Sequence, residues 1–383
     1  MYTAVKHKKW RKLPDNTKRE LLRKYYQDHF PVHLLCDLMN LSRIPLAFLD
    51  ISVSYCYNGT TIYSKYKEKY RYASDIHRVL TSKVPTKLEF GAYYPTPNKR
   101  VVTSHRMKDQ LRYPSNLVID VDLQDYAVEG FFPEVYHLSP CTHKKPNICC
   151  KHCWNMFIRP GYQVLILLLK LKFGFTNCFV VDSGKKGYHL HCFDYQSFMV
   201  FSTKEARQFL VRCLRGEGLS KAIEDRIFEE VLLPHHRQVN RQYQLREKLD
   251  PYKLTALRDI NGTGTMGKTF TRHDVLVNFI HNLNDEKKER VLRHVAKNLY
   301  WPRIDEGHLE NPRSVYKTPF SCHFDTEFLS LPIPDLENYN PDNDRIPLRK
   351  VLENPSLLEQ PKRLLKLHVL EEKPEAYSYN ESV

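Results

Sequence analysis

The chain has 383 residues, 42% of them hydrophobic and 12% aromatic, a globular composition that excludes pervasive disorder. Lysine and arginine number 59 against 44 acidic residues, and the net charge of +15 favours a polyanionic partner such as nucleic acid or an anionic membrane surface. No apolar run reaches the roughly 18 residues of a membrane span, and the basic N-terminus lacks the apolar region of a secretory signal. We therefore expect an intracellular protein, not secreted and without a membrane partner, whose ten cysteines are mostly free thiols.

The first third of the chain predicts two helices and four strands. An amphipathic pattern predicts the first helix, and Asn58-Gly59 is typical of a hairpin turn between two strands. The expected elements are a helix at 14–41, strands at 48–57 and 61–66, a helix at 74–82, and strands at 87–93 and 116–122. A basic loop at 95–108 separates the last two strands.

The rest of the chain predicts a helix, two strands and a long helical region. The expected elements are a helix at 154–173, strands at 177–182 and 187–193, helices between 204 and 300, a short strand at 328–333 and a polar tail from 371. The loop NGTGTMG at 261–267 contains glycines but lacks the strand-to-helix context of a phosphate loop.

Two aspartates lie on the predicted strand NLVIDVDLQDY. Because side chains alternate along a strand, Asp120 and Asp122 share one face, while Ile119 and Val121 point into the core. Two carboxylates on one face repel unless a cation lies between them, and Mg²⁺ or Mn²⁺ would also leave sites for phosphate oxygens. The alternative is a strand end that exposes both acids to water.

The motif DSGKKGYHLHCFD places a glycine-flanked turn between two strands. Successive N–H groups in such a turn can bind an anion, and Ser183, Lys185 and Lys186 add donors and charge that suit a triphosphate. His189 and His191 follow on one face of the next strand. The alternative is an ordinary hairpin with solvated lysines.

The motif CTHKKPNICCKHCW contains the spacing of a zinc site. Cys150 and Cys153 form a Cys-x-x-Cys pair, and Cys141 with His143 completes four ligands for a closed, structural Zn²⁺ site. Cys149 and His152 are alternative ligands in the same motif, and unrelated free thiols remain the other interpretation.

The segment WPRIDEGHLENPRSVYKTPFSCHFD offers Asp305, Lys317 and His323. An acid flanked by basic residues is a general pattern, so these residues alone also fit a solvated surface segment.

Taken together and in this order, the motifs resemble the small, catalytic subunit of the archaeo-eukaryotic primase superfamily. The similarity runs from Tyr25 to Ile333 and includes YYQDHFP, LEFGAYY, the DVD strand, CxxCW, SGKKGYH, WPRID and KTPFSCHFDT. It implies an α+β class, namely the mixed-sheet primase catalytic (Prim) fold with an inserted zinc motif and a mostly helical segment. The implied organisation is a basic segment at 1–15, a catalytic domain at 16–335 and a helix with a polar tail at 336–383. Within the catalytic domain the zinc motif covers about 136–154 and the helical region about 201–300.

The resemblance also implies roles for individual residues. Asp120, Asp122 and Asp305 would bind two catalytic Mg²⁺ or Mn²⁺ ions. The incoming nucleotide would be held by Ser183, Lys185, Lys186, His189, Arg303, Lys317, His323 and, through a looser N-terminal alignment, Lys65. Asp50 stands where the family places a Glu.

Several positions depart from the family pattern. The usual SGRRG turn is SGKKG here, and lysine lacks the bidentate fork of arginine. Cys141-x-His143 replaces a pair of cysteines, and Ser314 stands where a His is usual. These departures indicate a divergent member, viral or protist, whose three aspartates are intact.

The expected function is synthesis of short RNA primers on single-stranded DNA from ribonucleoside triphosphates, by two-metal nucleotidyl transfer during replication. The resemblance implies a primase large subunit, a replicative complex of the DNA polymerase alpha type, and a location in the nucleus or at a site of viral DNA replication. The alternatives are a primase-polymerase that uses dNTPs in repair, and a zinc-stabilised nucleic-acid-binding protein without catalysis.

Overall fold

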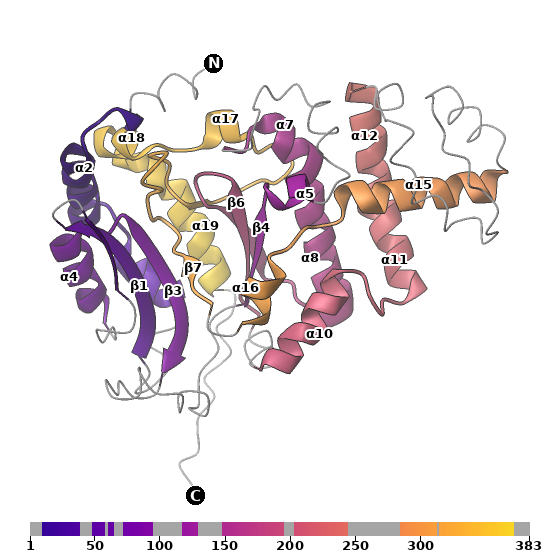
Figure 1. The fold of residues 1–383 in the computed structure, drawn as a ribbon, viewed down its shortest axis with the longest axis horizontal. Helices are drawn as coiled ribbons and strands as arrows, with labels where there is room; N and C mark the ends of the chain where they lie inside the picture. Colours follow the sequence, from indigo (N-terminus) through magenta and orange to yellow (C-terminus); the bar gives the residue numbers. More distant parts are fainter. Residues whose placement is uncertain are drawn as a thin grey trace, which may run out of the picture. The chain divides into compact units, whose positions relative to one another are not determined.

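The computed structural model describes residues 10–38, 48–57, 60–64, 72–94, 117–128, 148–194, 203–243, 284–311 and 314–370. The chain folds into two compact units. The first consists of Met1–Asp120, Phe175–Val211 and Asp305–Val383, and the second of Val121–Gly174 and Arg212–Ile304. Figure 1 shows strands and helices in the first unit and helices in the second, so the expected α+β class is confirmed.

The first unit contains a four-stranded sheet in the order β2-β1-β3-β7. Its strands are β1 (Phe48–Tyr57), β2 (Thr60–Ser64), β3 (Lys87–Tyr94) and β7 (Tyr316–Lys317). All three pairings are antiparallel, and the register of β1 with β2 continues to the pair Tyr57 and Thr60, which confirms the predicted hairpin. The sequence does not predict β7, because a strand of two residues has no periodicity to detect.

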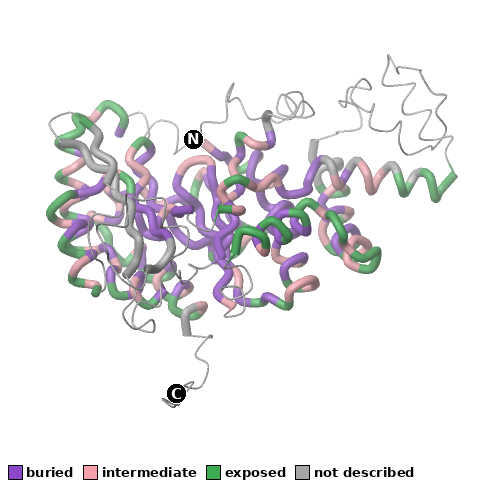
Figure 2. The backbone as a smooth tube through the Cα atoms, turned by 60° about the horizontal axis from the view of Figure 1, so that its bottom comes forward, coloured by how far each residue is buried: buried purple, intermediate pink, exposed green. Residues whose placement is uncertain are grey.

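A second four-stranded sheet has the order β4-β6-β5-β8. Its strands are β4 (Leu117–Asp122), β5 (Cys178–Asp182), β6 (Gly187–Cys192) and β8 (Leu331–Pro332). Strands β5 and β6 are antiparallel and are joined by the turn SGKK, while β8 pairs antiparallel with the other edge of β5. All six residues of β6 are buried, and Figure 2 shows the burial along the backbone. The first unit includes β4 as far as Asp120.

Helices cover these sheets and share one hydrophobic core with them. The core contains residues of α2 (Asp15–Asp28), α3 (Val32–Leu38), α4 (Ala73–Lys83), α18 (Leu348–Glu353) and α19 (Glu359–Leu370), together with residues of β3, β5 and β8. Helix α19 packs against α3 and β8.

The prediction of a single helix over 14–41 is wrong. Helix α2 ends at Asp28 and α3 begins at Val32, with Pro31 between them. Proline has no N–H for the helical hydrogen bond, and it disfavours helical geometry in the residue before it. The chain therefore turns at 29–31 and continues as a second helix.

Smaller elements complete the first unit. They are α16 (Glu306–Glu310), α17 (Pro341–Asp344), the 3₁₀ helix η5 (Pro355–Leu358) and the first part of α10 (Lys204–Leu214).

The described part of the second unit is helical apart from the end of β4. It contains α5 (Asp125–Val128), α7 (Lys151–Cys153), the π-helical turn η2 (Trp154–Ile158), α8 (Arg159–Phe173), α11 (Lys221–Ile227), the π-helical turn η3 (Phe228–Leu232), α12 (Leu233–Tyr243) and α15 (Asp285–Tyr300). Helix α8 ends at Phe173, and the φ of 76° at the following Gly174 is the left-handed conformation common at helix C-termini. The loop at 261–267 lies outside the described residues. None of the helices that the structure describes is long and apolar enough to cross a membrane.

Candidate active site

Strand β4 carries the first two aspartates. Its burial alternates as the sequence predicts: Ile119 and Val121 are fully buried, whereas Asp120 and Asp122 are half-buried. The apolar side chains anchor the strand in the core, so that both carboxylates lie on the opposite face.

Asp305 comes from a distant part of the sequence to the end of the same strand. Its backbone N–H donates a hydrogen bond of 3.1 Å to the carbonyl oxygen of Asp120. Its carboxylate caps α16, since Oδ1 accepts a 2.9 Å hydrogen bond from the N–H of His308. The structure therefore brings Asp120 and Asp305 side by side, and Asp122 follows two residues along β4.

Oxygen donors of this kind suit a hard cation such as Mg²⁺ or Mn²⁺. Among the residues that the structure describes, no group of three or more His, Cys, Asp or Glu side chains is close enough to hold an ion. Two features therefore favour a metal ion here. They are the oxygen donors of the aspartates and the backbone hydrogen bond that joins Asp305 to Asp120.

His189 lies beside the first aspartate. Its Nε2 is 3.6 Å from Oδ1 of Asp120, and its ring packs edge-on against Tyr316 of β7. Burial lowers the pKa of His189 well below its ordinary value, and the nearby His191 and Lys317 lower it further. The ring is consequently neutral at physiological pH, and the contact with Asp120 is that of a dipole with a carboxylate.

The turn between β5 and β6 is closed by a hydrogen bond of 3.0 Å from the N–H of Ser183 to the carbonyl of Gly187. Gly184 has a φ of 85°, and a Cβ at this position would lie 2.8 Å from the carbonyl oxygen of Phe328. Only glycine fits, because both the left-handed backbone and the close approach of another loop exclude a side chain. The turn therefore packs tightly on the segment that contains His323 and Phe328.

Lys317 and His323 lie against this turn. The Lys317 ammonium donates a 2.5 Å hydrogen bond to the Ser183 carbonyl, and a Cβ on Gly184 would lie 3.3 Å from Cβ of His323. Burial lowers the pKa of Lys317 to about 7, which leaves it poised between charged and neutral forms near physiological pH. Burial, followed by the positive charge of Lys317, lowers the pKa of His323 to about 2, so His323 is neutral.

The two lysines of the turn differ in their surroundings. Lys185 forms an ion pair of 2.8 Å with Asp325, a residue that is 57% exposed at its side chain. Lys186 is half-buried. A phosphate group that used Lys185 would have to compete with the Asp325 carboxylate.

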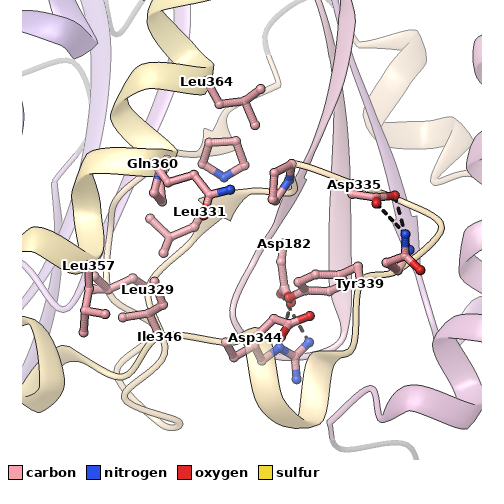
Figure 3. A pocket seen from close by; sticks show the side chains of 15 residues that line it. Asp182, Leu329, Leu331, Asp335, Tyr339, Asp344, Ile346, Leu357, Gln360 and Leu364 are labelled. Atoms are coloured by element: carbon pink, nitrogen blue, oxygen red, sulfur yellow. Dashed lines mark hydrogen bonds and ion pairs between the residues drawn. The ribbon is translucent and has the colours of Figure 1, made fainter.

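The sequence did not predict the buried residues that contact the turn between β5 and β6. Asp182, at the end of β5, is buried and forms an ion pair with the buried Arg345. The Tyr339 hydroxyl donates a 2.6 Å hydrogen bond to the Asp182 carboxylate. These three residues also line a cavity of about 330 Å³, which Figure 3 shows. The only local signal was the acid that precedes SGKKG, because Arg345 lies 163 residues farther along the chain.

Other predicted site residues lie in the second unit or outside the described residues. The backbone N–H of Arg303 donates a 3.3 Å hydrogen bond to the Tyr126 hydroxyl. Lys65, Cys141 and His143 are not among the described residues, and the same holds for the side chain of Asp50. Ser314, the residue that stands where the family usually has a His, belongs to the first unit; it is buried and donates a hydrogen bond to the carbonyl of His308.

The described part of the zinc motif brings two cysteines together. The sulfurs of Cys150 and Cys153 are 3.7 Å apart at the start of α7, and all three of Cys149, Cys150 and Cys153 are buried. The thiol of Cys149 instead donates to the carbonyl of Cys150, at 3.6 Å.

Comparisons with known proteins identify the family of the chain. Among solved structures, the chain is similar to the polymerase domain from Mycobacterium tuberculosis ligase D in complex with DNA, with 11% sequence identity, 88% of this chain and 92% of that chain covered, and a TM-score of 0.37. No curated protein matches the sequence. The model of the family described as DNA primase small subunit matches residues 119–334, more than half of the chain. The chain therefore belongs to the DNA primase small subunit family, a family of nucleotidyltransferases.

Proposed function

We propose that this protein is the catalytic subunit of a primase, which synthesises short RNA primers on single-stranded DNA from ribonucleoside triphosphates. The observation that carries the proposal is the hydrogen bond between the backbones of Asp305 and Asp120, beside the neutral His189. It joins acids from distant parts of the sequence, as a site for nucleotidyl transfer requires.

Asp120, Asp122 and Asp305 are the residues that would hold Mg²⁺ or Mn²⁺. When bound, such ions offset the charge of the triphosphate and favour ionisation of the primer 3′-hydroxyl. The protein itself positions the reactants. A neutral His189 can donate a hydrogen bond to an anionic oxygen without carrying a charge that would compete for the aspartates.

The triphosphate of the incoming nucleotide binds at the turn between β5 and β6. Ser183, Lys185, Lys186 and Lys317 supply hydroxyl and ammonium donors there, and His323 lies against the same turn. Lys65 and Arg303 contribute further positive charge from other parts of the chain. Lysine binds phosphate as a point charge, so this pocket holds the triphosphate through several single contacts and has no arginine fork in the turn.

Cys141, His143, Cys150 and Cys153 hold a structural zinc ion. The support comes from the 3.7 Å between the sulfurs of Cys150 and Cys153. Two sulfurs at about 2.3 Å from one tetrahedral ion are about 3.8 Å apart, so this spacing fits two ligands of the same zinc ion. The thiol of Cys149 has a different partner, which favours Cys150 as the ligand of the two.

The net charge of +15 supports binding of a single-stranded template, with an affinity that falls as salt rises. Membership of the family supports a primase large subunit as partner, within a replicative complex that contains a polymerase of the DNA polymerase alpha type. The corresponding location is the nucleus or a site of viral DNA replication.

The test is incubation of the purified chain with unprimed single-stranded DNA, labelled ribonucleotides and Mg²⁺ or Mn²⁺, with and without dNTPs as competitors. We expect short, alkali-labile products that require the template and that disappear with Asp120→Asn. Extension of a primed template by dNTPs alone would instead identify a primase-polymerase. DNA binding without any synthesis would identify a non-catalytic nucleic-acid-binding protein.

A further inference from the structure

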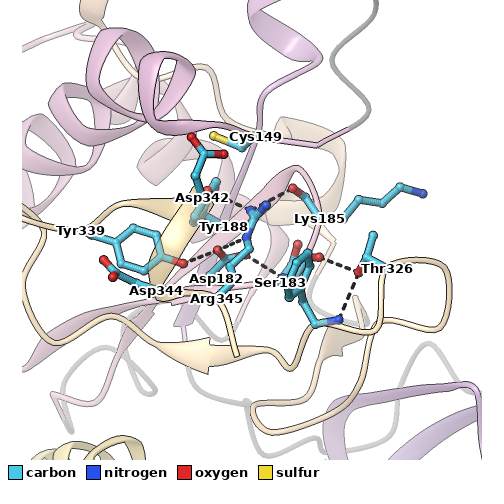
Figure 4. Close-up of polar contacts among 12 residues, drawn as sticks. Cys149, Asp182, Ser183, Lys185, Tyr188, Thr326, Tyr339, Asp342, Asp344 and Arg345 are labelled. Atoms are coloured by element: carbon cyan, nitrogen blue, oxygen red, sulfur yellow. Dashed lines mark hydrogen bonds and ion pairs between the residues drawn. The ribbon is translucent and has the colours of Figure 1, made fainter. Parts of the chain in front are cut away.

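Two successive carbonyl oxygens of the turn between β5 and β6 are held by donors from the C-terminal part of the chain. The Thr326 hydroxyl donates a 2.8 Å hydrogen bond to the carbonyl of Gly184, and Nη2 of Arg345 donates one of 2.9 Å to the carbonyl of Lys185 (Figure 4). Both donors belong to the first unit, as the turn does.

The hydrogen bonds from Thr326 and Arg345 fix the direction of the N–H groups of the turn. None of the described peptide bonds is cis, and in a planar trans peptide the C=O and N–H groups point in opposite directions. Holding the carbonyls of Gly184 and Lys185 therefore directs the N–H groups of Lys185 and Lys186 away from Thr326 and Arg345. Successive N–H groups on one side of a turn with a left-handed residue form an anion-binding nest.

Arg345 is itself fixed by a buried carboxylate. Its Nε and Nη2 lie 2.7 Å and 3.2 Å from the two oxygens of Asp182, and the two side chains are only 2% and 3% exposed. Asp182 also accepts hydrogen bonds from the Tyr339 hydroxyl, at 2.6 Å, and from the N–H of Gly184, at 2.7 Å. The guanidinium thus has one orientation, in which its remaining donor capacity meets the turn.

A buried ion pair adds little to the free energy of unfolding, because desolvation of both charges offsets their attraction. This ion pair instead fixes the position of the guanidinium. The planar guanidinium spans from the Asp182 carboxylate to the Lys185 carbonyl, and it also reaches the Tyr188 hydroxyl at 3.1 Å. The single ammonium of lysine cannot satisfy this set of acceptors at once.

We infer that Arg345, held by Asp182 and Tyr339, is a positioning residue that orients the phosphate-binding turn of this enzyme. The inference rests on the proposed function, which supplies the nucleotide triphosphate that the turn would bind. Arg345 and Tyr339 lie beyond residue 334, where the match to the family ends, so this support for the turn is outside the matched segment.

The test uses Arg345→Lys, which keeps the positive charge beside Asp182 but cannot also hold the turn. The double variant Asp182→Asn with Arg345→Gln removes both charges, in case the single change prevents folding. We expect hydrogen exchange of the 183–187 amides, measured without nucleotide, to become roughly tenfold faster. In primer synthesis we expect the KM for ATP to rise roughly tenfold while kcat changes less than about twofold.

Asn177→Ala is the matched control. Asn177 is buried just before the start of β5, and its side chain donates a 2.8 Å hydrogen bond to the carbonyl of His368 in α19. Its loss should lower the melting temperature without affecting exchange at 183–187 or the KM for ATP. The inference is overturned if Arg345→Lys and the double variant match this control in both measurements. If the wild type makes no primers, the proposed function is rejected but the inference about Arg345 is not. Hydrogen exchange at 183–187 still tests that inference, because it needs no nucleotide.

Discussion

The backbone N–H of Asp305 donates a hydrogen bond of 3.1 Å to the carbonyl oxygen of Asp120. This contact fixes the start of α16 against β4, and it brings together two aspartates that lie far apart in the sequence. Since the side chains take no part in the bond, both carboxylates keep their oxygens for other partners, of which the N–H of His308 is one for Asp305.

The first prediction follows from this geometry and concerns Asp305→Asn. Asparagine is as good an N-cap as aspartate, so it should preserve the hydrogen bond from His308 and the fold of α16. It removes the negative charge that a divalent cation requires. We expect primer synthesis to fall by at least about 10²-fold with an unchanged melting temperature. Glu310→Gln, at the exposed end of the same helix, is the control and should retain full activity.

A second prediction concerns the ion pair between Lys185 and Asp325, which are 2.8 Å apart. Because a nucleotide phosphate must compete with the Asp325 carboxylate, Asp325→Asn should lower the Kd for ATP about two- to fivefold, the range of a partly exposed ion pair. Lys185→Ala should raise it about tenfold.

A double-mutant cycle checks this assignment by ATP titration in the presence of Mn²⁺. Asp325→Asn should have no further effect in the Lys185→Ala background, because the lysine through which it acts is absent. An equal effect of Asp325→Asn in both backgrounds would mean that Asp325 repels the nucleotide directly and that Lys185 is a solvated lysine.

The third prediction concerns zinc. Purified protein should contain about one Zn²⁺ per chain, and Cys153→Ser should lose both the metal and thermal stability. Cys149→Ser should retain zinc, because the Cys149 thiol contacts the carbonyl of Cys150. Elemental analysis of the variants decides between these ligands.

Cys213→Ser is the matched control for zinc, since Cys213 is a buried cysteine of the same unit outside the motif. It should keep a full equivalent of metal. Folded wild-type protein without zinc would reject the site. Loss of zinc in Cys149→Ser alone would mean that Cys149, and not Cys150, is a ligand.

Local patterns of the sequence predicted the parts of the fold that depend on neighbouring residues. Asn58-Gly59 predicted the hairpin of β1 and β2, and alternation along β4 predicted which side of the strand carries Asp120. Pro31 was visible as well, but the amphipathic pattern on both sides of it concealed the break between α2 and α3.

The parts that could not be predicted depend on contacts between distant residues. Nothing in the spacing of Asp120 and Asp305 brings them together, and only the resemblance to a family suggested one site. Arg345 is 163 residues from Asp182, in the segment at 336–383 for which the sequence predicted only a helix and a polar tail. A partner at that distance is set by the packing of β5 against the C-terminal segment, which no local motif encodes.

The last prediction concerns Lys317, whose pKa burial lowers from 10.5 to about 7. In the unfolded chain the lysine is protonated up to about pH 10, whereas in the folded protein it loses its proton above about pH 7. Between these values the unfolded state binds more protons, so this residue makes the free energy of unfolding rise with pH. Below pH 7 the folded protein bears the full cost of holding a charge at this half-buried position.

Lys317→Met removes that charge and keeps the length of the side chain. We therefore expect the variant to be more stable than the wild type by about 1–3 kcal/mol at pH 6, with a gain that shrinks as the pH rises from 7 to 10. Urea unfolding at several pH values measures the difference. Lys362→Met, which removes a lysine paired with the exposed Glu359 in α19, away from Lys317, is the control and should show no such dependence. A difference between Lys317→Met and wild type that stays constant across this range would mean that Lys317 remains charged in the folded protein, its ammonium being sufficiently stabilised by the Ser183 carbonyl.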